Sequence, residues 1–289
     1  MYPASFDYSA PTTVDEALAL LAQHGEGAKL LAGGHSLLPL MKLRLAQPTH
    51  LVDLRRLPSL SGIRRAADTL VIGAMTTHVE IADSADVLHA APALADAAGH
   101  IGDPQVRNRG TIGGSLAHAD PGADLPAVML ATDAMIVTVG PGGTRTIDAD
   151  DFFVDIFTTA LLPGELLTEI RIPMPTGRSA SAYAKHPHPA SRYAIAGVAA
   201  TVWLERMGDR IERASLALTG FGNKASRAIG AEQTLAGRTA DVETIAAAAA
   251  RVADGIETPA DAHGDAAYKI ELLRVCAERA ISKAIERAR

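Results

Sequence analysis

Two glycine-rich segments in the first half of the chain decide its fold: residues 29–36, KLLAGGHS, and residues 107–116, RNRGTIGGSL. Each joins apolar residues to a predicted loop that contains two adjacent glycines. Because glycine has no side chain, such a pair lets backbone amides approach a phosphate closely. Two such segments, far apart in sequence, predict that one diphosphate is bound from two sides. We therefore expect a dinucleotide cofactor.

Neither segment fits the better-known phosphate motifs. The pattern GxxxxGK[ST] of nucleotide triphosphatases is absent, and neither segment reads GxGxxG at the start of a helix after the first strand. A glycine pair alone also fits a plain tight turn, so its surroundings must decide.

No GxSxG nucleophile motif occurs, and the single cysteine, Cys276, lies in a predicted helix beside leucines. We therefore expect no catalytic side chain and leave the chemistry to a cofactor.

Composition narrows the class of protein. The 289 residues are 48% hydrophobic and 21% charged, which suits a globular protein of two or three domains. The net charge of −6 argues against nucleic-acid binding. One cysteine excludes an internal disulfide and an iron–sulfur cluster held by this chain alone. The start of the chain lacks a signal-peptide pattern and no membrane span is expected. A cytoplasmic location is expected, with peripheral attachment to the inner membrane face left open.

Local patterns predict an α+β fold. Residues 13–16 and 77–80, TVDE and THVE, are capping boxes that start helices. Strands are expected at the following ranges: 28–32, 51–54, 70–74, 135–139, 144–147, 181–185, 195–204 and 211–218. Helices are expected after each capping box, up to Gly25 and Ala98, and at 123–131, 245–252 and from about 265 to the end, whereas 101–110 reads as irregular. A concentration of proline, glycine and serine around 173–177 predicts a linker.

The two segments, followed by residues 121–126, PGADLP, resemble the FAD-binding medium subunit of the molybdenum hydroxylases, the xanthine dehydrogenase and carbon monoxide dehydrogenase family. The resemblance runs over nearly the whole chain. It implies an FAD-binding domain of two subdomains, similar to the vanillyl-alcohol-oxidase type, at 1–57 and 58–175. A C-terminal domain with an antiparallel sheet and helices would follow at 176–289.

The resemblance also implies site residues. Backbone amides and the hydroxyls of Ser36 and Thr111 would hold the diphosphate, and Lys29 and Leu30 would approach the adenosine half. Asp124 would accept a hydrogen bond from a ribose or ribityl hydroxyl. The full set of expected cofactor-binding residues is Lys29, Leu30, Leu31, Ala32, Gly33, Gly34, His35, Ser36, Leu37, Thr111, Ile112, Gly113, Gly114, Ser115, Asp124, Leu161, Leu162, Lys185 and Tyr193.

Several of these side chains also have simpler interpretations. Leu161 or Leu162 and Lys185 would lie near the flavin ring, where a lysine favours the anionic reduced form. Lys185 could equally be a solvated strand residue, and Asp124 a helix N-terminal acid. Tyr193 could stack on the flavin or pack at a strand start. The run HPHP at 186–189 contains two histidines that could bind a metal ion. The prolines beside them and the lack of a third ligand nearby argue against a metal site, so no metal is expected.

The predicted function follows from the same resemblance. The chain would be an electron-transfer subunit that accepts electrons from the [2Fe–2S] centres of a small subunit. A large subunit would carry molybdopterin and the substrate, and the complex would be a dimer of heterotrimers. Two alternatives remain open: a self-sufficient flavin oxidase or reductase of the vanillyl-alcohol-oxidase type, and a structural subunit without cofactor. The substrate and the final electron acceptor are not predicted.

Overall fold

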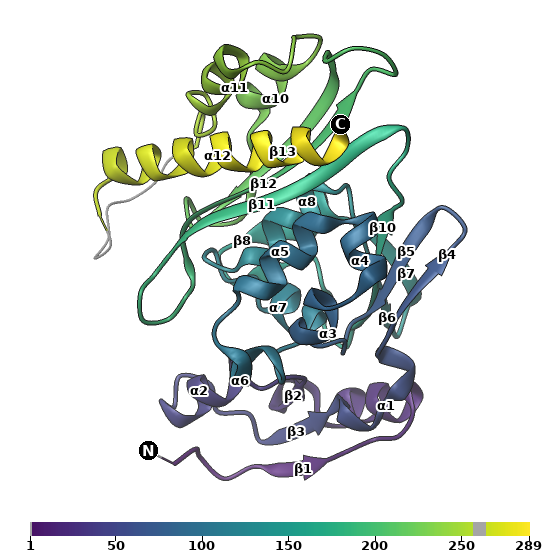
Figure 1. Cartoon of the computed structure of the whole chain (residues 1–289). Coiled ribbons are helices and arrows are strands. Elements are labelled where there is room, and N and C mark those ends of the chain that lie inside the picture. The colour runs from purple at the N-terminus through teal and green to yellow at the C-terminus, as the bar shows by residue number, and fades with distance from the viewer. Residues whose placement is uncertain (1, 257–263) are drawn as a thin grey trace.

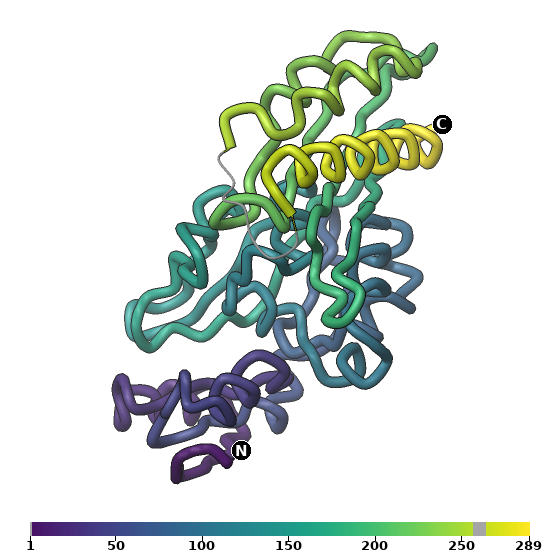
Figure 2. The backbone as a smooth tube through the Cα atoms, turned by 90° about the vertical axis from the view of Figure 1, so that its left-hand side faces the viewer, coloured from purple at the N-terminus to yellow at the C-terminus, as the bar shows by residue number. Residues whose placement is uncertain are grey.

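The computed structural model describes residues 2–256 and 264–289, and Figure 1 shows three successive parts of the chain stacked on one another. The purple N-terminal part forms a separate lobe in Figure 2, below the teal middle part and the green and yellow C-terminal part. Each part is built around its own sheet. The mixture of helices and sheets confirms the α+β class.

The N-terminal part is a small parallel sheet with order β1-β3-β2. Its strands and helices are β1 (Asp7–Ser9), α1 (Val14–His24), β2 (Ala28–Leu31), α2 (Leu37–Lys42) and β3 (His50–Asp53). The predicted capping box is confirmed: the Thr13 hydroxyl accepts from the Glu16 amide, and the Glu16 carboxylate accepts from the Thr13 amide. Helix α1 ends at Gly25, as expected.

The middle part is an antiparallel sheet of five strands, order β4-β5-β10-β6-β7, packed against helices. Its strands are β4 (Ile63–Ala66), β5 (Thr69–Gly73), β6 (Met135–Gly140), β7 (Gly143–Asp148) and β10 (Leu166–Pro173), and a small ladder joins β8 (Phe153–Asp155) to β9 (Thr158–Thr159). Its helices are α3 (His78–Ala82), α4 (Ala85–Ala90), α5 (Pro92–His100), α6 (Pro104–Arg107), α7 (Ile112–His118), α8 (Asp124–Ala131) and α9 (Ala149–Phe152). Helix α8 is buried throughout and forms part of the largest core.

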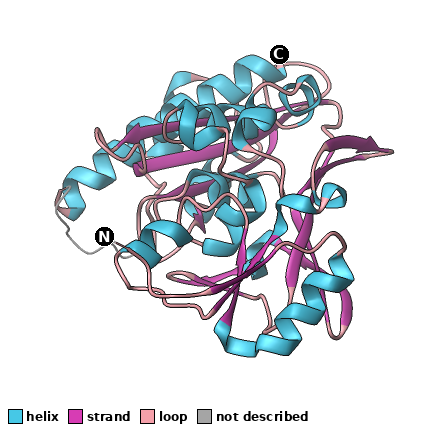
Figure 3. Cartoon of the chain, turned by 90° about the horizontal axis from the view of Figure 1, so that it is seen from below, coloured by secondary structure: helices cyan, strands magenta, loops and turns pink. Residues whose placement is uncertain are grey.

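The C-terminal part is an antiparallel sheet with helices on both faces (Figures 1 and 3). Its elements are β11 (Arg178–Pro187), β12 (Ala194–Leu204), β13 (Ile211–Thr219), β14 (Ser226–Arg227), α10 (Ile229–Leu235), α11 (Val242–Ala249) and α12 (Ala266–Ala288). Because side chains alternate along a strand, Val198 packs with the C-terminal helices while its neighbour Ala199 joins the core of the middle part. This alternation fixes the C-terminal part onto helices α5 and α8 of the middle part.

The structure differs from the sequence predictions in three places. Residues 101–110 contain helix α6, which Asp103 caps by accepting from the Val106 amide. The second glycine segment is the first turn of α7 rather than a loop, because Thr111 provides its N-cap. Strands β4 and β10 were not predicted, although β10 is the central strand of its sheet. The domain boundaries at 57/58 and 175/176 remain predictions; β10 ends at Pro173 and β11 begins at Arg178.

Candidate functional site

The first glycine segment leaves its backbone donors free. It turns the chain from β2 into α2, with Gly34 at a φ of +80°, a conformation that side chains disfavour. Among the described residues, the amides of Gly33, Gly34, His35, Ser36 and Leu37 donate no hydrogen bond. Consecutive free amides in such a turn form a concave site for an anion. This arrangement fits the diphosphate of a dinucleotide.

The two glycine segments touch through their backbones. A Cβ atom on Gly33 would overlap the carbonyl oxygen of Arg109 and would lie 2.8 Å from the Cα of Gly110. A Cβ atom on Gly114 would lie 3.4 Å from the Cβ of Ala32. The N-terminal part and the middle part are therefore in contact through these two segments, as a site that binds one ligand from two sides requires.

The amides of the second segment are already engaged. Those of Ile112 and Gly113 donate to the carbonyls of Thr76 and Ala74, at 3.0 and 2.8 Å. Those of Gly114 and Ser115 donate to the hydroxyl and carbonyl of Thr111. These four amides have acceptors within the chain, and their predicted contact with the diphosphate stays a prediction. The second segment also provides a surface without side chains against which the first segment lies.

Tyr193 brings the C-terminal part to the same place. It stands at the end of the β11–β12 connection, and its ring Cδ1 would lie 3.4 Å from a Cβ atom on Gly122. Burial raises the pKa of Tyr193, Asp120 adds to the rise, and a hydrogen bond with Ser36 opposes it. Ser36 belongs to the first glycine segment and Gly122 precedes α8, so all three parts of the chain meet at this tyrosine.

Asp124 and Lys185 form a buried ion pair beside Tyr193. The Lys185 ammonium donates to Oδ2 of Asp124 at 2.9 Å, and the side chains are only 4% and 5% exposed. The hydroxyl of Tyr183 donates to Oδ1 at 2.6 Å. Burial raises the pKa of Asp124, and the lysine and the two hydrogen bonds oppose the rise. The carboxylate is thus held by protein donors on both oxygens, and its predicted contact with a cofactor hydroxyl stays a prediction.

The remaining expected residues differ in exposure. Lys29 is exposed, Leu31 is buried, and Leu30, Ala32 and Leu37 are half-buried. His35 is exposed in the first segment. Leu161 packs against the main core, whereas Leu162 is 54% exposed.

Sequence reasoning missed two contributors to the site. Tyr183 supplies the second donor to Asp124, and Arg109 supplies the carbonyl that faces Gly33. A signal for Tyr183 exists: it lies two residues before Lys185, so both side chains share one face of a strand.

His188, in the run HPHP at 186–189, has a structural role. The Nδ1 atom of His188 accepts from the amides of Ala190 and Ser191, at 3.2 and 3.1 Å, and so shapes the turn before Tyr193. Over residues 2–256 and 264–289, no cluster of three or more potential metal ligands is present. In the same ranges, no helix combines the length and hydropathy needed to cross a bilayer.

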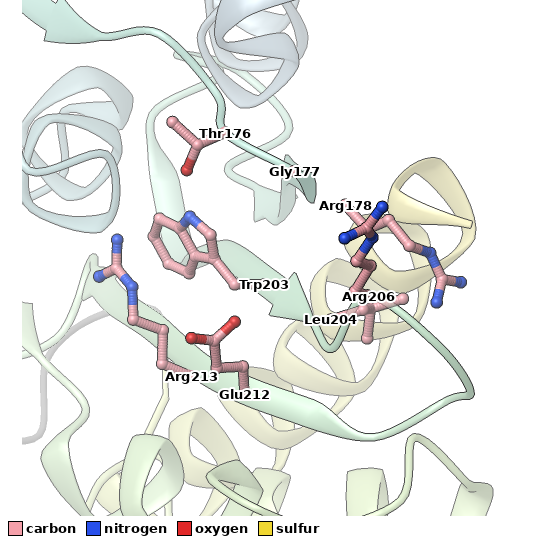
Figure 4. A pocket seen from close by; sticks show the side chains of 8 residues that line it. All are labelled: Thr176, Gly177, Arg178, Trp203, Leu204, Arg206, Glu212 and Arg213. Carbon is pink, nitrogen blue, oxygen red and sulfur yellow. The ribbon is translucent and has the colours of Figure 1, made fainter.

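A surface hollow of about 410 Å³ lies elsewhere, around Trp203 (Figure 4). The guanidinium of Arg213 covers the indole at 3.4 Å, and no residue of either glycine segment lines the hollow. It is therefore separate from the site described above.

Comparison with known proteins identifies the family of the chain. Residues 4–175 match the family model "FAD binding domain in molybdopterin dehydrogenase", and residues 181–284 match "CO dehydrogenase flavoprotein C-terminal domain". The carbon monoxide dehydrogenase medium chain of Hydrogenophaga pseudoflava is 44% identical over 98% of both chains. The 6-hydroxypseudooxynicotine dehydrogenase complex subunit alpha of Paenarthrobacter nicotinovorans is 41% identical over 100% of this chain and 97% of the relative.

Solved structures match equally well. Carbon monoxide dehydrogenase from H. pseudoflava superposes with a TM-score of 0.95 at 45% identity, over 99% of both chains. Quinoline 2-oxidoreductase from Pseudomonas putida 86 gives a TM-score of 0.93 at 35% identity, over 100% of this chain and 99% of that chain. The chain therefore belongs to the family of FAD-binding medium subunits of the molybdenum hydroxylases.

Proposed function

We propose that this chain is the FAD-carrying electron-transfer subunit of a molybdenum hydroxylase complex. It takes electrons from the [2Fe–2S] centres of a small subunit and delivers them to an external acceptor. The contact of Gly33 with the backbone of Arg109 and Gly110 carries this proposal. It supports a single ligand site built from two subdomains.

The residues present fit FAD. The free amides of residues 33–37 and the Ser36 hydroxyl would hold the diphosphate, because these five consecutive amides have no acceptor among the described residues. The bare second segment would lie along it. Tyr193 would shield the ring, and Lys29 and Leu30 would approach the adenosine half. Leu161 or Leu162 would lie near the ring. Bound FAD supplies the ability to accept electrons singly and release them in pairs.

Substrate choice is assigned to the large subunit. The similar relatives are named for carbon monoxide and for 6-hydroxypseudooxynicotine, at 44% and 41% identity. Two relatives named for such different substrates match this chain about equally well over their whole length, which is best explained if the substrate binds elsewhere. We further propose a cytoplasmic dimer of heterotrimers.

The test is the flavin content of the full chain, alone and co-expressed with its small and large subunits. One FAD per chain is expected, measured by absorbance after release and by protein concentration. A colourless complex would favour the structural-subunit alternative. Turnover of an organic donor by the isolated chain would favour the self-sufficient oxidase. Gly34→Val should reduce FAD retention for two reasons. A side chain at this position would overlap Leu38, and valine disfavours the positive φ of Gly34.

A further inference from the structure

The β11–β12 connection, residues 188–193, carries Tyr193 and is held from both ends. The His188 amide donates to the Tyr193 carbonyl at 2.7 Å, and the Arg192 amide donates to the His188 carbonyl at 2.9 Å. Arg192 itself has a φ of +64°, an uncommon conformation for a residue with a side chain. This tip therefore needs contacts outside itself to keep one conformation.

Lys185 provides such a contact. Besides the bond to Asp124, its ammonium donates to the carbonyl oxygen of Arg192 at 2.7 Å. An ammonium has three donors and no acceptor, so it can link a carboxylate and a carbonyl at once. Asp124 opens helix α8 of the middle part, and Arg192 directly precedes Tyr193. One buried side chain thus connects the FAD domain to the tip that presents the tyrosine.

Asp124, the partner of the lysine, is itself held by a second donor from β11. Tyr183 and Lys185 point from the same face of β11 and donate to different oxygens of Asp124. Gly197 on β12 makes room for this arrangement, because a Cβ there would overlap the Tyr183 hydroxyl. With its partners on packed elements, the ammonium has little freedom, as a positioning group requires.

We propose that Lys185 is a positioning residue: held by Asp124, it fixes the carbonyl of Arg192 and so keeps Tyr193 in place beside Gly122, before the start of α8. The consequence for the flavin rests on the proposed function. The anchoring of the tip does not, and it can be measured without cofactor.

The first experiment is limited trypsin digestion of the full chain without FAD. Cleavage after Arg192 is followed by the mass of the fragment 193–289. Lys185→Met should speed this cut about fivefold, because one net hydrogen bond no longer opposes opening of the tip. Lys283→Met is the matched control: it also removes an ion pair between the two domains, with Asp96 at 3.0 Å, but touches no residue of the tip. An unchanged rate, or an equal increase in the control, overturns the proposal.

A second variant tests the proposal in case Lys185→Met does not fold. Lys185→Met leaves Asp124 buried without its cation, which can cost several kcal/mol. The pair Lys185→Met with Asp124→Asn buries no charge and still removes the anchor. Circular dichroism confirms folding, and the same faster cut is expected.

The second experiment uses the fluorescence of bound FAD. A phenol stacked on a flavin quenches it, so Lys185→Met should raise the fluorescence when Tyr193 is present. In a Tyr193→Leu background the same change should have no effect, since Lys185 acts through the tyrosine. Equal changes in both backgrounds would mean that Lys185 acts on the flavin directly and would overturn the proposal. Failure to bind FAD contradicts the proposed function, whereas the trypsin result still decides the anchoring.

Discussion

The Cα atom of Gly33 faces the carbonyl oxygen of Arg109 at a separation that leaves no room for a methyl group. Gly33 follows a strand of the N-terminal sheet, and Arg109 precedes a helix of the middle part. The contact therefore sets how the first subdomain sits on the second. The first of the five free amides, that of Gly33, therefore lies beside the backbone of the second segment.

Gly33→Ala should weaken FAD binding. The neighbouring atoms are backbone and cannot rotate away, so the backbones of the two segments must move apart. We expect the purified complex to contain markedly less than one FAD per chain, and added FAD to bind at least about tenfold more weakly, a loss of about 1.4 kcal/mol.

Gly142→Ala provides the control for this substitution. It lies in the predicted and confirmed β6–β7 turn, where a Cβ would meet nothing within 4 Å. FAD content should stay at the wild-type level. Full FAD content in Gly33→Ala would show that the segments do not cooperate in binding.

Gly197→Ala should destabilise the chain through Tyr183. The added methyl would overlap the Tyr183 hydroxyl and push it from Asp124. Such overpacking costs about 1–3 kcal/mol, measured by chemical denaturation. Tyr183→Phe removes the obstructing oxygen, so the double variant should lose less stability than the two single variants together. Strict additivity would mean that the hydroxyl is not the obstacle.

Local signals predicted the parts of the fold that depend on neighbouring residues. The capping boxes at Thr13 and Thr77 were confirmed because both partners of each bond lie within one turn. The hairpin of β6 and β7 was confirmed because proline and glycine specify its turn. Strand β10 escaped prediction because its two neighbours, β5 and β6, come from distant parts of the chain.

The site divides in the same way. The glycine pairs can be recognised in the sequence. The contact between them depends on the tertiary structure, which the spacing of the residues does not reveal. The free amides of the first segment and the engaged amides of the second could not be distinguished, because the acceptors Ala74 and Thr76 belong to the chain after β5. Likewise, Asp124 and Lys185 were each identified, but their ion pair was not.

Thr219→Val should loosen the contact between the middle and C-terminal parts. The buried Thr219 hydroxyl lies 2.8 Å from the carbonyl of Pro121 and 2.7 Å from that of Ala123, directly before α8. Valine has the same shape but leaves the Ala123 carbonyl without this donor, at a cost of about 1–3 kcal/mol in the free energy of unfolding. Thr219→Ser keeps the hydroxyl and should recover most of the loss. An equal loss in the serine variant would assign the effect to the methyl group.

The buried His78 should make stability depend on pH. Its side chain is 4% exposed, and its Nδ1 has no hydrogen-bond partner among the described residues. Burial, assisted by His35 and Arg107, lowers the pKa of His78 from 6.5 to about 4. The folded chain keeps this imidazole neutral while the unfolded chain protonates it, so stability is present above pH 6.5 and is lost as the pH falls toward 4. With about 1.4 kcal/mol for each pKa unit, the loss reaches about 3 kcal/mol.

The measurement is the free energy of unfolding by urea between pH 4 and pH 7.5, for the wild type and His78→Gln. Glutamine does not titrate, so the curve of the variant should be flatter between pH 4 and 6.5. The pKa values of Asp53 and Asp96 are lowered by their arginine and lysine partners, which outweigh burial, and these carboxylates lose their contribution at still lower pH in both proteins.

Since His78 donates its amide to the Gly110 carbonyl at 3.0 Å, its protonation should also disturb the second glycine segment. FAD should therefore dissociate from the wild type over the same pH window, and identical pH curves for both proteins would rule His78 out as the cause.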